Sequence, residues 1–145
     1  LDVFGQIEPE YAKEFDALVR KYSDCVQYKG CVVSEDSVQV LKSYYAMLFP
    51  TYWQGEGFPG TVLDAFASGL PVIATDFNAN AEIIEDGKTG LIYPGKYAET
   101  LDDAVYFAEK NRDVFLKMKR DCLLEYDKYT PSNILKQICR DLERK

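Results

Sequence analysis

Residues 56–76 read EGFPGTVLDAFASGLPVIATD, and this stretch decides the fold. The glycines at 57 and 60 predict a loop, because glycine adopts backbone conformations that other residues avoid. A short helix is expected over residues 61–68, ending at Gly69, since glycine commonly follows a helix C-terminus. The apolar run from Pro71 to Ala74 then predicts a buried strand. Loop, helix and strand in this order are typical of an α/β protein.

The same alternation extends in both directions along the chain. Strands are expected at residues 1–4, 25–28, 46–49, 71–74 and 91–93. Helices are expected at residues 9–22, from 34 onward, at 61–68, 98–110 and 113–127, and after 130–131. Short apolar strands that alternate with helices predict a parallel sheet covered on both faces. No repeat or linker is visible, so the sequence predicts one α/β domain over residues 1–145, with helices at its C-terminus.

The charge balance excludes several functions. Seventeen Lys and Arg against 24 Asp and Glu give a net charge of −7, and the sequence has no histidine. Catalysis by Ser-His-Asp or Cys-His groups and His-ligated zinc therefore cannot be built from these residues. The acidic balance argues against nucleic acid as a partner. An acidic chain that binds phosphate would need a local source of positive potential.

The loop at residues 51–60 can supply that potential. Ligands of parallel α/β proteins bind beyond the carboxyl ends of the strands, and this loop follows the strand at 46–49. The loop leads into a helix N-terminus, whose free N–H groups attract anions without any lysine or arginine. Glu56 and Asp64 flank it, and carboxylates accept hydrogen bonds from sugar hydroxyls or stabilise an oxocarbenium ion. From these residues alone, the opposite interpretation has equal weight: Glu56 caps backbone N–H groups and Asp64 is a solvated helix residue.

The cysteines and the apolar runs bear on the compartment. The four cysteines form no CxxC pair and no metal-ligand spacing, so we expect buried, reduced thiols. Residues 1–10 show no signal segment, and the apolar runs are far shorter than the roughly 20 residues of a membrane span. These observations predict a cytoplasmic protein. The four positions are Cys25, Cys31, Cys122 and Cys139.

Several ordered motifs together resemble one enzyme family. They are EGFPGTVLDAFASGLPVIATD at 56–76, NAEIIEDGKTGLIYPG at 80–95 and VQYKG at 26–30. As a set they are similar to the C-terminal nucleotide-sugar-binding domain of retaining family 4 glycosyltransferases of GT-B fold. In that family a Glu, seven intervening residues and a second Glu stand where this chain has Glu56 and Asp64. The resemblance implies a Rossmann-like donor half of a two-domain enzyme.

The resemblance implies a role for each matching residue. Glu56, as the catalytic-site residue, would bind the hydroxyls of the donor sugar and stabilise the transition state. The backbone of Gly57, Phe58, Pro59, Gly60 and Thr61 would face the sugar and diphosphate. Asp64 would bind the ribose. The base would lie along Gly30, Cys31 and Val32. The family transfers a sugar from a nucleotide sugar to an acceptor such as a glycan or lipid-linked saccharide, in polysaccharide biosynthesis, with no catalytic metal and no further cofactor.

Three positions depart from the family pattern. Asp64 is one methylene shorter than the usual Glu, Pro59 stands where Gly is common, and residues 77–81 read FNANA where two glycines are typical. The alternatives to a transferase are a nucleotide-sugar-binding module without catalysis, or a GT-B phosphorylase or nucleotide-sugar epimerase.

The resemblance also implies parts beyond these residues. The acceptor-binding N-terminal domain and the first strand of the donor domain have no counterpart here, so the chain alone is expected to be inactive. A sheet without that strand has open edges, which suggests self-association. The whole enzyme is expected to be cytoplasmic or peripheral at the inner face of a membrane.

Two aromatic residues precede the glycine-rich loop and have two possible roles. Tyr52 and Trp53 either stack on an acceptor sugar or pack at the rim of the site, with packing favoured. Lys88, in the turn at residues 86–90, is expected to be a solvated residue.

Overall fold

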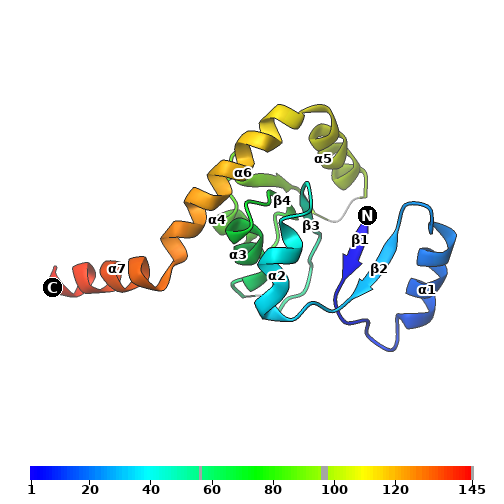
Figure 1. Cartoon of the computed structure of the whole chain (residues 1–145), viewed down its shortest axis with the longest axis horizontal. Coiled ribbons are helices and arrows are strands. Elements are labelled where there is room, and N and C mark those ends of the chain that lie inside the picture. The colour runs from blue at the N-terminus through cyan, green and yellow to red at the C-terminus, as the bar shows by residue number, and fades with distance from the viewer. Residues whose placement is uncertain (56, 96–97, 145) are drawn as a thin grey trace. The chain divides into compact units, whose positions relative to one another are not determined.

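The computed structural model describes residues 1–55, 57–95 and 98–144. Within them the chain forms two compact units, Leu1–Ser37 and Val38–Lys145, and each is described by itself (Figure 1). All paired strands are parallel, so the predicted α/β class is confirmed. The strands divide between two sheets, β1-β2 and β3-β4-β5, where one sheet was expected. That the chain is a single domain stays a prediction.

The first unit is a β-α-β element. Its strands are β1 (Asp2–Phe4) and β2 (Gln27–Gly30), joined through helix α1 (Ala12–Lys21). The ring of Phe15 on α1 meets Tyr28 edge-on, with 5.3 Å between the centroids. None of the described side chains of residues 1–37 is buried. The core of the protein therefore lies in the second unit.

The predicted start of α1 at Pro9 is wrong. The helix begins at Ala12, because the preceding residues form a turn in which the Tyr11 N–H donates to the Glu8 carbonyl at 3.0 Å. Helix α2 (Ser34–Leu41) begins at Ser34, as the sequence predicts.

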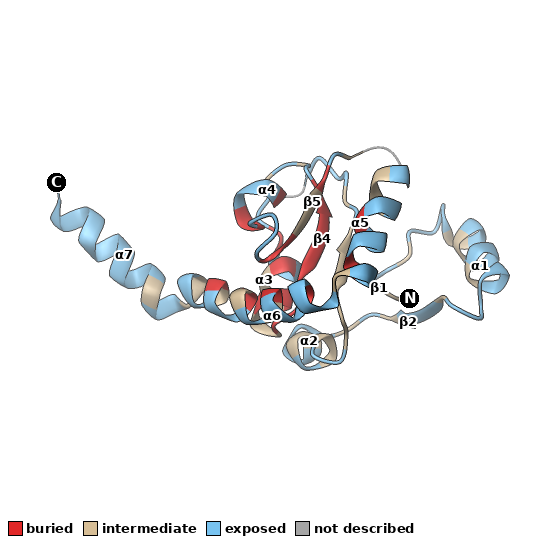
Figure 2. Ribbon diagram, turned by 90° about the horizontal axis from the view of Figure 1, so that it is seen from above, coloured by how far each residue is buried: buried red, intermediate tan, exposed pale blue. Residues whose placement is uncertain are grey.

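The second unit has a three-stranded sheet with β4 at its centre. The strands are β3 (Met47–Phe49), β4 (Val72–Thr75) and β5 (Gly90–Tyr93). Every residue of β4 is buried (Figure 2). A central strand of a parallel sheet is covered on both faces, which is why this segment is a continuous apolar run.

Alternate residues of β4 pack against different helices. Val72 and Ala74 belong to one apolar cluster with helix α3 (Gly60–Ala67), whereas Ile73 belongs to another with helix α5 (Ala98–Lys110). Helix α6 (Arg112–Tyr126) contributes to both clusters. The prediction of helices on both faces is therefore confirmed for this sheet.

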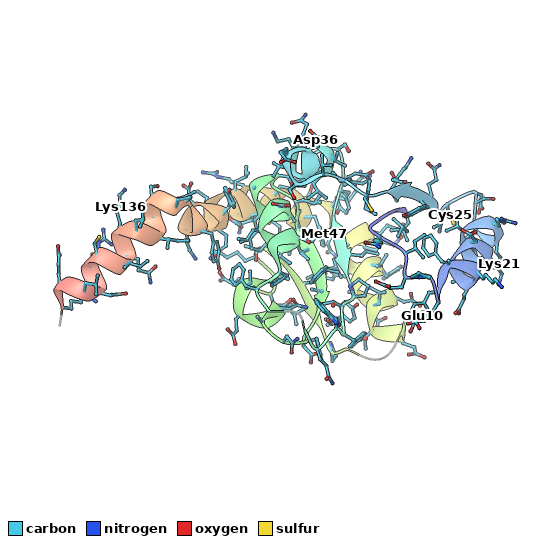
Figure 3. The ribbon with its side chains drawn as sticks, turned by 90° about the horizontal axis from the view of Figure 1, so that it is seen from below. Glu10, Lys21, Cys25, Asp36, Met47 and Lys136 are labelled. Carbon is cyan, nitrogen blue, oxygen red and sulfur yellow. The ribbon has the colours of Figure 1, made fainter. Side chains whose placement is uncertain are left out.

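The remaining elements lie at the ends of the strands and of the chain. The short helix α4 (Asn80–Ile83) and the 3₁₀ turn η1 (Asp127–Tyr129) were not predicted. The last helix, α7 (Pro131–Glu143), begins at the expected proline and has no buried residue. Lys136 extends from α7 into solvent, whereas Met47 packs inside the unit (Figure 3). None of the described helices is both long and apolar enough to cross a bilayer.

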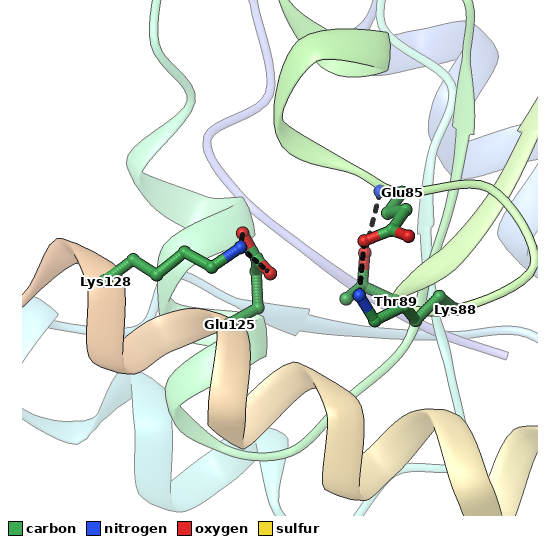
Figure 4. A network of polar contacts seen from close by, with 5 residues as sticks. All are labelled: Glu85, Lys88, Thr89, Glu125 and Lys128. Carbon is green, nitrogen blue, oxygen red and sulfur yellow. Dashed lines mark hydrogen bonds and ion pairs between the residues drawn. The ribbon is translucent and has the colours of Figure 1, made fainter.

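The turn at residues 86–90 joins α6 at the amino end of β5. The Glu85 N–H donates to Thr89 Oγ1 at 2.9 Å, and the buried Cys122 thiol donates to the Thr89 carbonyl at 3.3 Å. Lys88 is exposed and pairs with Glu85 at 2.6 Å (Figure 4). Since this turn precedes β5, it lies at the amino ends of the parallel strands. The loops that follow β3 and β4 lie at the carboxyl ends. The solvated role expected for Lys88 agrees with its exposure.

The prediction of four buried thiols is wrong for three of them. Cys122 is buried, and burial raises the pKa of its thiol to about 12. The exposed cysteines are Cys25, Cys31 and Cys139. Cys25 and Cys31 flank β2, and Cys139 lies on the exposed helix α7.

Candidate functional site

The predicted site surrounds the carboxyl ends of β3 and β4. The loop after β3 and the segment after β4 are held side by side. Thr75 Oγ1, at the end of β4, donates to the Thr51 carbonyl at 2.8 Å. Asn78 Nδ2 donates to the Trp53 carbonyl at 3.3 Å. These two bonds connect loop segments that are more than twenty residues apart in sequence.

A buried polar pair supports this arrangement. Asn80 is 1% exposed, and its Nδ2 donates to the Thr75 carbonyl at 3.1 Å and to Thr75 Oγ1 at 3.5 Å. Among the described residues, Asn80 Oδ1 has no hydrogen-bond partner. Buried polar groups are usually paired, so this pair is a specific structural feature. Sequence reasoning missed it, and the only signal was a threonine at the end of an otherwise apolar strand.

Helix α3 begins at the glycine-rich loop, one residue before the predicted start. Its N-cap is the buried Pro59, with φ −74° and ψ 104°, and no side chain of the described residues caps the helix. The first helical hydrogen bond runs from the Val62 N–H to the Pro59 carbonyl at 3.0 Å. Gly60 and Thr61 are exposed, and the first turn has no acidic residue. An anion could therefore approach this helix end without meeting a carboxylate of that turn.

The other predicted residues of this loop differ in exposure. Gly57 is exposed, and Phe58 is exposed with its ring 5.5 Å from that of Tyr129. Burial raises the pKa of the Tyr129 hydroxyl, and nearby Glu125 adds to the shift. Asp64 is half-buried on α3, and its main-chain carbonyl accepts the Ser68 N–H at 3.1 Å. Glu56, the predicted catalytic residue, lies outside the described residues.

The three residues predicted to contact the base belong to the first unit. Gly30 ends β2 with a positive φ of 75°, a conformation that glycine adopts without strain. Its carbonyl accepts the Gly5 N–H at 3.0 Å. Cys31 is exposed and Val32 is half-buried. The backbone after β2 therefore turns sharply, as a loop at a strand end would.

The structure assigns different environments to the two aromatic residues before the loop. Tyr52 packs: its ring lies 5.9 Å from that of Phe77, and a Cβ added to Gly95 would come within 2.8 Å of it. Gly95 is fixed in turn by its N–H, which donates to Asp76 Oδ1 at 2.9 Å. Trp53, in contrast, is 68% exposed. Both side chains thus contact neighbouring residues, Tyr52 at Phe77 and Gly95 and Trp53 at Gly55, and Trp53 is the more exposed of the two.

Two observations concern other kinds of site. Among the described residues, no group of three or more His, Cys, Asp or Glu side chains is placed to hold a metal ion. The first unit has two shallow surface hollows, of about 590 and 260 Å³, one along α1 at Lys13 and Arg20 and one beside Phe4 and Tyr28. Neither hollow is lined by a residue that the sequence predicts for the site.

Comparisons with known proteins agree with the fold and extend it. A family model described as "Glycosyl transferases group 1" matches residues 1–111. Spore coat protein SA of Bacillus subtilis (strain 168) is 30% identical over 113 residues, which are 74% of this chain and 30% of that protein.

Two solved structures share the fold at lower identity. Sucrose-phosphate synthase from Thermosynechococcus elongatus has a TM-score of 0.78 at 19% identity, over 99% of this chain and 38% of that one. Anabaena Alr3699/HepE in complex with UDP-glucose has a TM-score of 0.81 at 17% identity, over 99% of this chain and 40% of that one. The chain thus spans well under half the length of each of these three proteins.

Proposed function

Since the chain belongs to the group 1 glycosyl transferases, we propose that it is the nucleotide-sugar-binding part of a retaining glycosyltransferase. The observation that supports this most is the exposed start of α3 directly behind a glycine-rich loop, where no described side chain caps the helix. This loop lies at the carboxyl ends of parallel strands, where α/β proteins bind their ligands. The relative Alr3699/HepE has the same fold and is a complex with UDP-glucose, which favours the same ligand class here.

Each group at the loop has a place in the proposed complex. The N–H groups of Gly60 and Thr61 bind the diphosphate, since they precede the first helical hydrogen bond. Asp64 accepts hydrogen bonds from the ribose, and Glu56 from the hydroxyls of the donor sugar. Gly57, Phe58 and Pro59 form the wall of the sugar subsite, and Gly30, Cys31 and Val32 contact the base through their backbone. These N–H groups stabilise part of the negative charge of the diphosphate without a metal ion, and Arg and Lys side chains from outside residues 1–145 would supply the rest.

The proposed reaction depends on orientation and charge stabilisation. The sugar leaves the diphosphate as an oxocarbenium-like species, and the acceptor hydroxyl attacks the same face of the anomeric carbon. The acceptor oxygen loses its proton to the leaving diphosphate oxygen, so no histidine is required in this part. Fixed N–H dipoles stabilise the charge that develops on the diphosphate. The acceptor-binding part of such an enzyme lies outside residues 1–145.

Amide chemical shifts of the ¹⁵N-labelled chain test the proposal. Addition of UDP, GDP or ADP, each with and without its hexose, is expected to shift the amides of residues 57–64. The variant D64A should weaken binding about tenfold by loss of a charge-assisted hydrogen bond. D86A is the matched control, because Asp86 lies at the amino ends of the strands, away from the loop at their carboxyl ends. If none of these nucleotides shifts residues 57–64, the proposal is wrong.

A non-catalytic binding module remains the second candidate, favoured by the short side chain of Asp64. Restoring the longer side chain separates the two. If the full-length protein is an enzyme in which Asp64 binds ribose, its D64E variant should transfer sugar at a rate within a few-fold of that of the unchanged protein. Absence of transfer from every nucleotide sugar, with binding intact, would favour the module.

A further inference from the structure

Trp53 is the most exposed large aromatic residue of the loop after β3. It is the only tryptophan in the sequence, and it is 68% exposed, whereas its neighbour Tyr52 packs against Gly95 and Phe77. Leaving an indole in water is unfavourable, because its apolar surface stabilises a protein only when buried. An exposed indole beside a ligand loop therefore points to a contact that forms later.

One face of the indole ring is already supported. A Cβ added to Gly55 would lie 2.8 Å from Trp53 Cζ2, 2.9 Å from Cε2 and 3.2 Å from Cη2. Three adjacent ring atoms at such similar distances mean that Gly55 approaches from above the ring plane, not from its edge. The absence of a side chain at Gly55 lets the ring lie flat on the backbone. Outside this contact the side chain is largely open to solvent, since Trp53 is 68% exposed.

The backbone of Trp53 is held in place as well. Its N–H donates to Thr51 Oγ1 at 3.3 Å, and its carbonyl accepts Asn78 Nδ2 at 3.3 Å. Asn78 has a positive φ of 48°, which asparagine tolerates better than most residues. Thr51 is bonded to the buried end of β4 through Thr75. The backbone that carries the ring is thus held before any ligand arrives, which lowers the entropy lost on binding.

We propose that Trp53 is a stacking platform for a pyranose ring, either the hexose of the donor or a separate saccharide. A pyranose presents a flat face of C–H groups, which packs on the face of an aromatic ring and is attracted by its negative quadrupole. The inference rests on the proposed function, because the loop would accept hydrogen bonds from sugar hydroxyls beside Trp53 only if it binds a nucleotide sugar. It assigns to Trp53 a contact with sugar, separate from the diphosphate contact at α3.

The single tryptophan makes the test direct, because the chain has one indole N–H resonance. The ¹⁵N-labelled chain is titrated with UDP, UDP-glucose, maltose and N,N′-diacetylchitobiose. We expect the indole resonance to move with UDP-glucose or a disaccharide and to stay in place with UDP. A response to UDP-glucose assigns the donor hexose, and a response to a disaccharide assigns a separate saccharide.

Three variants make the result specific. W53A should weaken binding of the responding sugar about threefold to tenfold, while W53F, which keeps an aromatic face, should stay within about twofold. G55A should lower sugar affinity without removing Trp53, because its Cβ displaces the ring. The affinity for UDP should be unchanged in W53A and W53F.

Three outcomes would overturn the inference. One is an indole resonance that no sugar moves while UDP shifts the amides of residues 57–64; this leaves the proposed function intact. Another is equal sugar affinity in W53A and the original chain. The third is an equal indole shift with UDP and UDP-glucose, which would assign a base or phosphate contact to Trp53. If UDP shifts no amide of residues 57–64, the proposed function fails and this inference with it.

Discussion

At the scale of single residues, the side chain of Asn80 supports the candidate site from inside the protein. It is buried, and it bonds the carbonyl and the hydroxyl of Thr75, which in turn bonds the Thr51 carbonyl. Hydrogen bonds inside a protein support one another, and removal of one leaves its partner desolvated. We therefore expect the geometry of the loop to depend on a residue that lies outside it.

The variant N80A tests this dependence. It should lower the free energy of unfolding by about 1–3 kcal/mol, because the Thr75 groups remain buried and lose a partner. Urea unfolding followed by circular dichroism measures the change. N133A is the control, since Asn133 Nδ2 also donates to a main-chain carbonyl, that of Asp127 at 2.7 Å, but in an exposed place. Equal losses in the two variants would contradict the importance of burial.

The residue scale also shows what the sequence could not reveal about the site. The motif at 56–64 located the loop, because glycines and carboxylates form a recognisable local pattern. The bond from Thr75 to the Thr51 carbonyl escaped prediction because it joins segments 24 residues apart, whose approach depends on the packed sheet. The bonds from Asn80 to Thr75 span only five residues, but the sequence carries no pattern that marks them. The different environments of Tyr52 and Trp53 escaped prediction for the same reason as the Thr75 bond, since packing against Gly95 is a long-range contact.

At the scale of elements, β4 and β5 approach each other closely at Gly90. A Cβ on Gly90 would overlap the Val72 carbonyl, with the Ile84 side chain 3.0 Å away. Only glycine fits there, since backbone approaches backbone.

The variant G90A should therefore destabilise the fold by about 1–3 kcal/mol or more, as expected when a packed interior is overfilled. Thermal unfolding measures it. G57A is the matched control: nothing lies within 4 Å of a Cβ at Gly57, so its unfolding midpoint should be nearly unchanged. An unchanged midpoint in G90A would mean that β5 can move away from β4 without cost.

Most elements could be predicted because their patterns are local. The strands of the second unit and the helices at 98–110 and after Thr130 differ from prediction by at most a residue or so. The short helix α4 escaped because four residues are too few for an apolar period. The start of α1 was wrong because proline suits a turn as well as a first helical turn.

At the scale of the whole chain, most strands are edge strands. Among the described residues, β4 has two strand partners, whereas β1, β2, β3 and β5 have one each. Edge strands present unpaired N–H and C=O groups, which pair readily with another chain. We propose, on this ground, that the chain self-associates.

Light scattering coupled to size-exclusion chromatography tests self-association. The apparent mass should exceed 16.5 kDa and rise with protein concentration. High salt should not abolish the effect, because backbone pairing is less screened than contacts between exposed charges. A constant monomer mass up to high concentration would count against the proposal.

The absence of buried side chains from the described part of the first unit has a dynamic consequence. Segments with few buried apolar contacts open with low free energy, while a core strand opens only when the whole unit unfolds. Backbone amides of Val3 and Tyr28 should therefore exchange with deuterium orders of magnitude faster than those of Val72 and Ile73. In this chain the segment that holds Gly30 would open and close many times during the lifetime of the folded second unit. Binding of a base at Gly30 would therefore be detected as slower deuterium exchange of the amides in that segment.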